Sequence, residues 1–226
     1  LTIVTPSEWL AKLVHESYLK EYPVKIINNG IDLNLFRPSG KNRTDVVKKV
    51  KEKKYIVLGV AFDWGFRKGL DIFIKLTDIL PADKYQIVLV GTSSIIDKEL
   101  PKSIISVHRT QNQEELVELY TLADVFAMPT REENFPTVNL EALACGTPVV
   151  TFDTGGSIEM INEKTGCVVP TNDVNTFANM IRKVCESKDY SEKDCLTKAK
   201  EYNMEDKFLD YLTLYESMNN KVENDS

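Results

Sequence analysis

The sequence alternates short apolar runs with segments of helical periodicity, and this alternation restricts the fold more than any other feature. We expect strands, from runs rich in β-branched residues, over residues 2–5, 24–28, 55–61, 86–90, 104–108, 125–128, 148–152 and 167–169. We expect helices over residues 7–19, 44–53, 69–80, 113–122, 137–145, 156–161, 174–186, 191–201 and 204–218. Strands that alternate with helices in this way form βαβ units and a parallel sheet. The chain is therefore predicted to be α/β and Rossmann-like, with about six mostly parallel, twisted strands and helices on both faces.

Composition limits the classes of function. The chain has 226 residues and a formal net charge of −6, which argues against nucleic-acid binding. Its four cysteines lack metal or redox spacing and it has two histidines, so we expect no metal site and a cytoplasmic protein. It has no apolar run long enough to cross a membrane and no signal peptide pattern. We expect one domain over residues 1–218 and a polar tail over 219–226, and the aromatics of the last helix have the spacing of a packed face.

A short buried strand followed by a short helix creates the first candidate site. Residues 124–129 are apolar, Pro136 suits a first helical position, and Gly146 suits the C-terminal cap. Unpaired N–H groups at the start of this helix, near Thr137 and Val138, would bind a phosphate.

Two carboxylates, Glu133 and Glu141, flank this helix start at a spacing of eight residues. Carboxylates repel phosphate, so they would have to face hydroxyl groups, for example a sugar on one side and a ribose on the other. The alternative is an ordinary helix with two surface glutamates, since short motifs are only hypotheses.

Two further loops follow predicted strands. Arg67 and Lys68 precede the helix that opens at Gly69, and two cations beside a helix N-terminus suit a diphosphate; two exposed cations on a turn are the alternative. Gly91 begins the loop that continues with Thr92, where a glycine lets the backbone approach a ligand, although a simple turn glycine would look the same.

These motifs occur in a recognisable order. The series runs Pro6-Ser7, Asn29-Gly30-Ile31-Asp32, Arg67-Lys68-Gly69-Leu70-Asp71, Val90-Gly91, the two-glutamate segment, Gly155-Gly156 with Glu159, and Thr165-Gly166 with Asp173. Over residues 1–215 the chain resembles the C-terminal half of the family 4 (group 1) retaining glycosyltransferases, which have the GT-B fold. From the local pattern alone, Glu159 is expected to cap or support the helix that follows it.

The resemblance implies roles for the charged residues. Lys68 matches the phosphate-binding lysine, and Glu133 and Glu141 match residues that contact the donor sugar and the ribose. The family often has an arginine where this chain has Phe62, so either Arg67 takes over that role or phosphate binding is weaker. A nucleophilic role for Glu133 is an alternative, but the resemblance assigns it to binding.

The resemblance also implies roles for the loops. Backbone N–H groups of Phe135 and Thr137 would lie near the phosphates or the sugar, in a loop that also contains Asn134 and Pro136. Pro136 replaces a glycine that is frequent in the family, and it removes one possible donor. Arg109 and Thr110 are candidate contacts to the nucleobase.

The implied activity of the complete enzyme is transfer of a hexosyl group from a UDP- or GDP-linked sugar to an acceptor hydroxyl with retention, in polysaccharide or glycolipid synthesis. No metal or other cofactor is implied. The chain starts inside a strand-like run without an initiator methionine, and we interpret it as a piece that lacks the N-terminal, acceptor-binding domain and is inactive alone. In the family the last helix crosses back to that domain, so the resemblance implies that some apolar residues of the last helix, among Phe208, Tyr211, Leu212 and Tyr215, are exposed here. Peripheral association of the full-length enzyme with the inner face of a membrane stays open. A sugar-nucleotide epimerase or hydrolase of the same architecture and a catalytically silent nucleotide-binding module are the alternatives.

Overall fold

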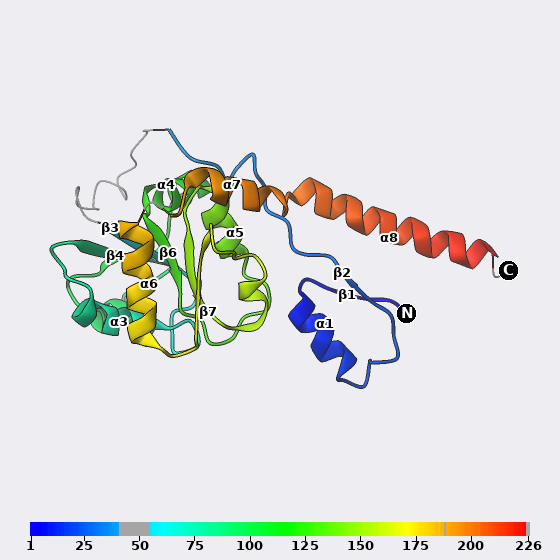
Figure 1. Ribbon diagram of the computed structural model, residues 1–226, viewed down its shortest axis with the longest axis horizontal. Helices are drawn as coiled ribbons and strands as arrows, with labels where there is room; N and C mark the ends of the chain where they lie inside the picture. Colours follow the sequence, from blue (N-terminus) through cyan, green and yellow to red (C-terminus); the bar gives the residue numbers. More distant parts are fainter. Residues whose placement is uncertain (41–54, 188, 225–226) are drawn as a thin grey trace.

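The computed structural model describes residues 1–40, 55–187 and 189–224, with the side chains of residues 221–224 left out (Figure 1). The helix expected over residues 44–53 lies outside the described residues. No helix in the described part is both long and apolar enough to span a bilayer.

A six-stranded parallel sheet forms the centre of the fold, as predicted. Its strands are β3 (Tyr55–Val60), β4 (Tyr85–Val90), β5 (Ile105–Val107), β6 (Val125–Met128), β7 (Val149–Phe152) and β8 (Gly166–Val169). Their order across the sheet is β5-β4-β3-β6-β7-β8, and every neighbouring pair is parallel.

Helices cover both faces of this sheet. One face carries α3 (Leu70–Ile79) and α6 (Val174–Glu186), and the other carries α4 (Gln113–Leu122), α5 (Thr137–Ala144) and α7 (Glu192–Lys200). Successive strand residues point to opposite faces, so Val57 and Val125 belong to the first half of the core while Leu58 and Phe126 belong to the second. The four central strands, β3, β4, β6 and β7, are buried from both sides, which explains their nearly continuous apolar sequences.

The strand order reverses between β3 and β6. From β3 the chain proceeds outward through β4 and β5, and from β6 it proceeds in the opposite direction through β7 and β8. Loops leaving the carboxyl ends of these two central strands therefore separate, and a crevice opens between them. Parallel α/β sheets bind their ligands at this switch point.

Residues 1–28 form a smaller unit beside the sheet (Figure 1). The strands β1 (Ile3–Thr5) and β2 (Val24–Ile26) pair in parallel around α1 (Glu8–His15). Ser7 is the N-cap of α1, as expected, and its hydroxyl accepts a hydrogen bond from the backbone N–H of Leu10 at 3.1 Å. The helix ends at His15 rather than at residue 19, because the Ser17 hydroxyl donates to the carbonyl of Val14 and accepts from the N–H of Leu19.

Three more helices complete the description: η1 (Ile96–Lys98) and η2 (Gly155–Ile158), both 3-10 helices, and α8 (Met204–Asn224). The α-helix expected over 156–161 is thus the short 3-10 helix η2. Phe208, Leu212 and Tyr215 on α8 have the spacing of a packed face, but each is more than half exposed, which is the alternative that the resemblance implies for the last helix. Figure 1 shows α8 extending away from the sheet.

Candidate functional site

A pocket of about 540 Å³ lies where the strand order reverses. Its walls come from the carboxyl end of β3, the loop after β3, the loop after β6 and the first turn of α5. The lining residues are Asn29, Val60, Ala61, Phe62, Asp63, Arg67, Lys68, Glu133, Phe135, Pro136, Thr137 and Val138. Six of the residues selected from the sequence, namely Arg67, Lys68, Glu133, Phe135, Pro136 and Thr137, thus line one cavity.

An ion pair lies in this pocket. The Nζ atom of Lys68, before α3, donates to Oε2 of Glu133, after β6, at 2.5 Å. The two loops meet because β3 and β6 are neighbours in the sheet. Both side chains are mostly covered, with 19% and 18% of their surfaces exposed. The pair therefore presents a cation and a carboxylate to the same small volume.

Gly69 allows the loop after β3 to approach the end of β6. Its φ is +75°, a left-handed value that strains other residues. A Cβ atom at this position would lie 2.3 Å from the carbonyl oxygen of Pro129. Glycine next to Lys68 is thus needed to place the cation in the pocket.

The start of α5 supplies backbone donors. Pro136 immediately precedes the helix, with φ −75° and ψ 110°, so the helix begins one residue later than its proline suggests. Within the described residues, the N–H groups of Thr137 and Val138 have no hydrogen-bond acceptor, and both residues line the pocket. An anion bound here would receive these donors together with the dipole of the helix.

Arg131, which the sequence analysis missed, connects the two loops of the pocket. Its guanidinium donates to both carboxylate oxygens of Asp71, at 2.8 and 2.9 Å, and to Oδ1 of Asn172 at 2.6 Å. It also lies over the ring of Phe66, 3.7 Å from the centroid. Burial raises the pKa of Asp71, but the hydrogen bonds from Arg131 and Lys75 outweigh it and lower the pKa. The only signal in the sequence was an arginine three residues after a buried strand.

Asn134 attaches the second loop of the pocket to its surroundings. The Ser7 hydroxyl donates to Oδ1 of Asn134 at 2.7 Å, and the backbone carbonyl of Asn134 accepts from the N–H of Gly156 at 2.7 Å. A Cβ at Gly156 would lie 2.1 Å from that carbonyl oxygen, and one at Gly155 would lie 1.7 Å from the carbonyl oxygen of Glu133. The glycine pair therefore permits close backbone packing against this loop.

Glu159 does not cap the helix that follows it. Its carboxylate accepts from the N–H groups of Glu8 and Trp9, at 3.0 and 2.9 Å, and so caps the first turn of α1. The sequence could not show this, because 150 residues separate the partners.

Glu141 lies one turn beyond Thr137 on the same side of α5, outside the lining of the pocket. The hydroxyl of Tyr120 donates to its Oε2 atom at 2.9 Å. Burial raises the pKa of Glu141, and the hydrogen bond from Tyr120 acts in the opposite direction.

The remaining candidates lie beyond the pocket lining, after β4 and β5. Gly91 has φ +86°, and the space that a Cβ atom would take is occupied by the carbonyl oxygen of Ala61, not left open for a ligand. Thr92 is buried and shares a hydrogen bond of 2.5 Å with Ser106. Arg109 is exposed and Thr110 is partly buried. Their contacts to a nucleobase stay predictions.

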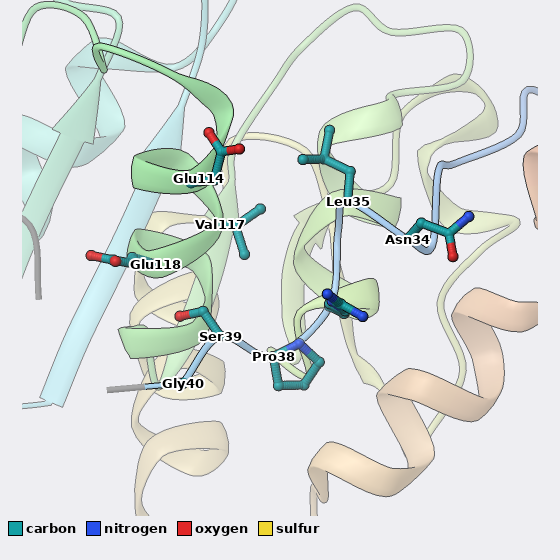
Figure 2. Close-up of a pocket in the computed structure, with 9 residues that line it drawn as sticks. Asn34, Leu35, Pro38, Ser39, Gly40, Glu114, Val117 and Glu118 are labelled. Atoms are coloured by element: carbon teal, nitrogen blue, oxygen red, sulfur yellow. The ribbon is translucent and has the colours of Figure 1, made fainter. Parts of the chain in front are cut away.

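A second pocket, of about 650 Å³, lies along α4 and is drawn in Figure 2. It is lined by residues 34–35 and 37–40 and by Glu114, Val117 and Glu118. Its charged lining residues are two carboxylates, Glu114 and Glu118, and one cation, Arg37, so it should attract a phosphate less than the pocket at the switch point does. Across the described ranges, no group of three or more histidine, cysteine, aspartate or glutamate side chains is arranged to hold a metal ion.

Comparisons with solved structures agree with this architecture. Sucrose-phosphate synthase from Thermosynechococcus elongatus superposes with a TM-score of 0.82 at 26% identity, over 96% of this chain and 58% of that chain. HepE of Anabaena, in complex with UDP and glucose, gives 0.78 at 18% identity, over 96% of this chain and 63% of its own.

Comparisons of sequence identify the family. A D-inositol 3-phosphate glycosyltransferase of Saccharomonospora viridis is 31% identical over 180 residues, which are 71% of this chain and 42% of that protein. One from Mycobacteroides abscessus is 28% identical over 169 residues, which are 70% of this chain and 38% of that protein. The chain thus spans about two fifths of the length of these relatives. The family model described as glycosyl transferases group 1 matches residues 40–202, and the chain belongs to this family.

Proposed function

We propose that this chain binds the nucleotide-sugar donor of a glycosyltransferase, and that the complete enzyme transfers a hexosyl group from a UDP- or GDP-linked sugar with retention. One observation carries the proposal. A pocket at the switch point of the sheet combines Arg67 and Lys68 with the free N–H groups of a helix start and a carboxylate, Glu133. This combination matches the parts of a nucleotide sugar: a diphosphate and a hydroxylated ring.

The diphosphate is assigned to the cations and the helix start. In sugar transfer the departing nucleoside diphosphate gains negative charge as the glycosidic bond breaks. Groups that hold this charge in fixed positions stabilise the transition state more than the ground state. Arg67 and Phe62 line the same pocket, which supports Arg67 as the replacement for the arginine that the family often has at Phe62. Because Arg67, Lys68 and two backbone N–H groups supply positive charge, the proposed reaction needs no metal ion.

The carboxylates are assigned to hydroxyl groups. Glu133 lies inside the pocket beside Lys68, so it would accept from the hydroxyls of the sugar, while its ion pair offsets its repulsion of the phosphates. Glu141 lies one turn further along α5 and would accept from the ribose. Binding, rather than nucleophilic attack, is the proposed role of Glu133.

The rest of the enzyme is also part of the proposal. The relatives are more than twice as long as the matched region, which supports an additional, acceptor-binding domain in the same polypeptide. The exposed aromatic residues of α8 are a surface that such a domain would cover. On this proposal the present chain alone binds the donor but does not transfer sugar. The complete enzyme would act in the cytoplasm, or at the inner face of its membrane, in polysaccharide or glycolipid synthesis.

Calorimetry on the purified chain tests donor binding. HepE, a protein of similar fold, has been crystallised with UDP and with UDP-glucose, so UDP is the first nucleotide to titrate, followed by GDP. At least one diphosphate should bind, and the corresponding monophosphate should bind more weakly because it lacks one phosphate. Absence of binding by both UDP and GDP would refute the proposal. For the complete enzyme, NMR of the product distinguishes transfer with retention from epimerisation or hydrolysis of the donor.

A further inference from the structure

Tyr120 is held in one position from several sides. It lies on α4 and is completely buried, with its ring at edge-to-face angles to Phe36 and Phe126, at centroid distances of 6.4 and 5.5 Å. Its backbone carbonyl accepts from the Thr147 hydroxyl at 2.5 Å. These contacts fix the ring, and a fixed ring places its hydroxyl at one point in space.

The hydroxyl of Tyr120 is directed at only one of the two carboxylate oxygens of Glu141. It donates to Oε2 at 2.9 Å. Within the described part of the chain, Oε1 has no hydrogen-bond partner, and it is not a fully buried atom. The tyrosine thus holds the carboxylate by one oxygen and leaves the other available. Packing alone would need only the ring of Tyr120, because the hydroxyl makes no other hydrogen bond in this region.

We propose that Tyr120 is a positioning residue, which holds the carboxylate of Glu141 so that its free oxygen accepts from the ribose of the bound nucleotide. The inference rests on the proposed function and goes further, because it assigns the orientation of the ribose contact to a buried residue that touches no ligand. A glutamate that is free to rotate would lose side-chain entropy on binding, and a glutamate already held does not.

The effect of Tyr120 on the Glu141 carboxylate can be followed in a pH profile of nucleotide binding, provided that the other titratable groups beside Glu141 do not titrate in the same range. They are Tyr120 on α4 and Cys145 at the end of α5. Burial raises the pKa of the Cys145 thiol to about 12 and raises that of the Tyr120 phenol well above its ordinary value. Both stay neutral in acidic and neutral solution, so neither contributes to the pH profile in this range. Groups that face the phosphates, such as Glu133, and the phosphates themselves affect ribose and dideoxy nucleotides alike, so the ratio of the two affinities reports Glu141.

The test compares ribose with dideoxyribose. Wild type and Tyr120→Phe are titrated by calorimetry with UDP and GDP and with their 2′,3′-dideoxy analogues. Tyr120→Phe should weaken the ribose nucleotides about three- to tenfold and change the dideoxy analogues less than about twofold, because only the former use the carboxylate. The ratio of ribose to dideoxy affinity should rise as the pH rises through the pKa of Glu141, and in Tyr120→Phe this rise should move to higher pH because the anion has lost a donor.

Tyr85→Phe is the matched control. Tyr85 is also a buried tyrosine that donates to a glutamate, Glu186, but this pair lies at the amino end of β4, away from the pocket. It should change neither the ribose preference nor the pH profile. Glu141→Asp, which keeps the charge but shortens the side chain, is a second variant in case Tyr120→Phe does not fold, and it should show the same ribose-selective loss.

The outcomes separate the two proposals. Equal weakening of ribose and dideoxy nucleotides by Tyr120→Phe, with an unshifted pH profile, would mean that Tyr120 only supports the fold and would overturn this inference alone. Failure of the wild-type chain to bind either nucleotide would overturn the proposed function and this inference with it. If Tyr120 acts only through Glu141, adding Tyr120→Phe to Glu141→Gln should cause no further ribose-selective loss of affinity. This result would support both the proposed function and the positioning role of Tyr120.

Discussion

Replacing Lys68 by alanine removes the most strongly placed cation of the pocket. Its Nζ atom lies 2.5 Å from Glu133, and 19% of its side-chain surface is exposed. A unit charge about 4 Å from a phosphate contributes roughly 4 kcal/mol at the effective dielectric constant of a partly covered site. The attraction of Glu133 for the same ammonium opposes ligand binding and removes part of this gain. We therefore expect Lys68→Ala to weaken the nucleoside diphosphate by about 1.5–3 kcal/mol, or roughly ten- to a hundredfold.

Calorimetry with UDP and GDP measures this loss, and a second lysine supplies the control. Lys75 is also on the α3 side of the pocket and is paired with Asp71 at 3.2 Å, but 57% of its side chain is exposed and it does not line the cavity. Lys75→Ala should leave affinity within about twofold of wild type, because exposed ion pairs contribute little. Equal affinities of Lys68→Ala and wild type would remove Lys68 from the site and contradict the assignment of the diphosphate.

A double mutant separates lost attraction from new repulsion. In Lys68→Ala, the carboxylate of Glu133 is left without its cation beside the bound phosphates. Lys68→Ala/Glu133→Gln should therefore bind UDP or GDP more tightly than Lys68→Ala alone. Weaker binding by the double mutant would show that the carboxylate does not face the phosphates at all.

Three further predictions follow from the same geometry. Arg67→Ala should weaken the binding of UDP or GDP about three- to tenfold in calorimetry, and less at high salt because Arg67 is exposed. Unchanged affinity would show that Arg67 does not replace the arginine that the family often has at the position of Phe62. Glu141→Gln should mainly reduce the affinity for the nucleotide, and Glu133→Gln should mainly reduce the discrimination among nucleotide sugars. If each variant changed both quantities equally, the assignment of Glu141 to the ribose and Glu133 to the sugar would be wrong. Arg131→Met should lower the melting temperature at pH 7, and this loss should shrink as the pH falls below 3.8, the ordinary pKa of Asp71. Because the pKa of this carboxyl is lowered in the folded state, its ion pair with Arg131 contributes fully above pH 3.8 and is lost as the pH falls through the folded-state pKa.

The fold was predictable because the four central strands, β3, β4, β6 and β7, are buried on both faces. Such strands must be apolar along their whole length, so the sequence shows them directly, and β3, β4 and β6 lie within a residue or two of their expected positions. The early end of α1 has a local cause in the hydrogen bonds of Ser17, whereas other failures concern residues whose surroundings come from distant parts of the sequence. A pair of glycines at 155–156 could begin an α-helix or a 3-10 helix, and the structure has the 3-10 helix η2, which packs closely against the backbone of residues 133–134.

The candidate site was predictable to the extent that it follows from topology. Lys68 and Glu133 were selected because they leave strands that proved to be adjacent at the switch point, where α/β folds bind ligands. The contacts of Arg131 were not accessible, because Asp71 and Asn172 lie about 60 and 41 positions away in the sequence. Gly91 shows the same limit: the sequence reveals that space is needed at this residue, but not that the Ala61 carbonyl occupies it.

The loop that carries Glu133 is held before any ligand arrives. Arg131 attaches its start to α3, Asn134 attaches it to Ser7 and to the N–H of Gly156, and Lys68 pairs with the glutamate itself. Each connection comes from a different element, so no single motion can release the carboxylate without breaking several hydrogen bonds. The entropy of ordering this loop is therefore lost on folding rather than on binding, and a ligand that meets the loop gains more of its interaction energy as affinity.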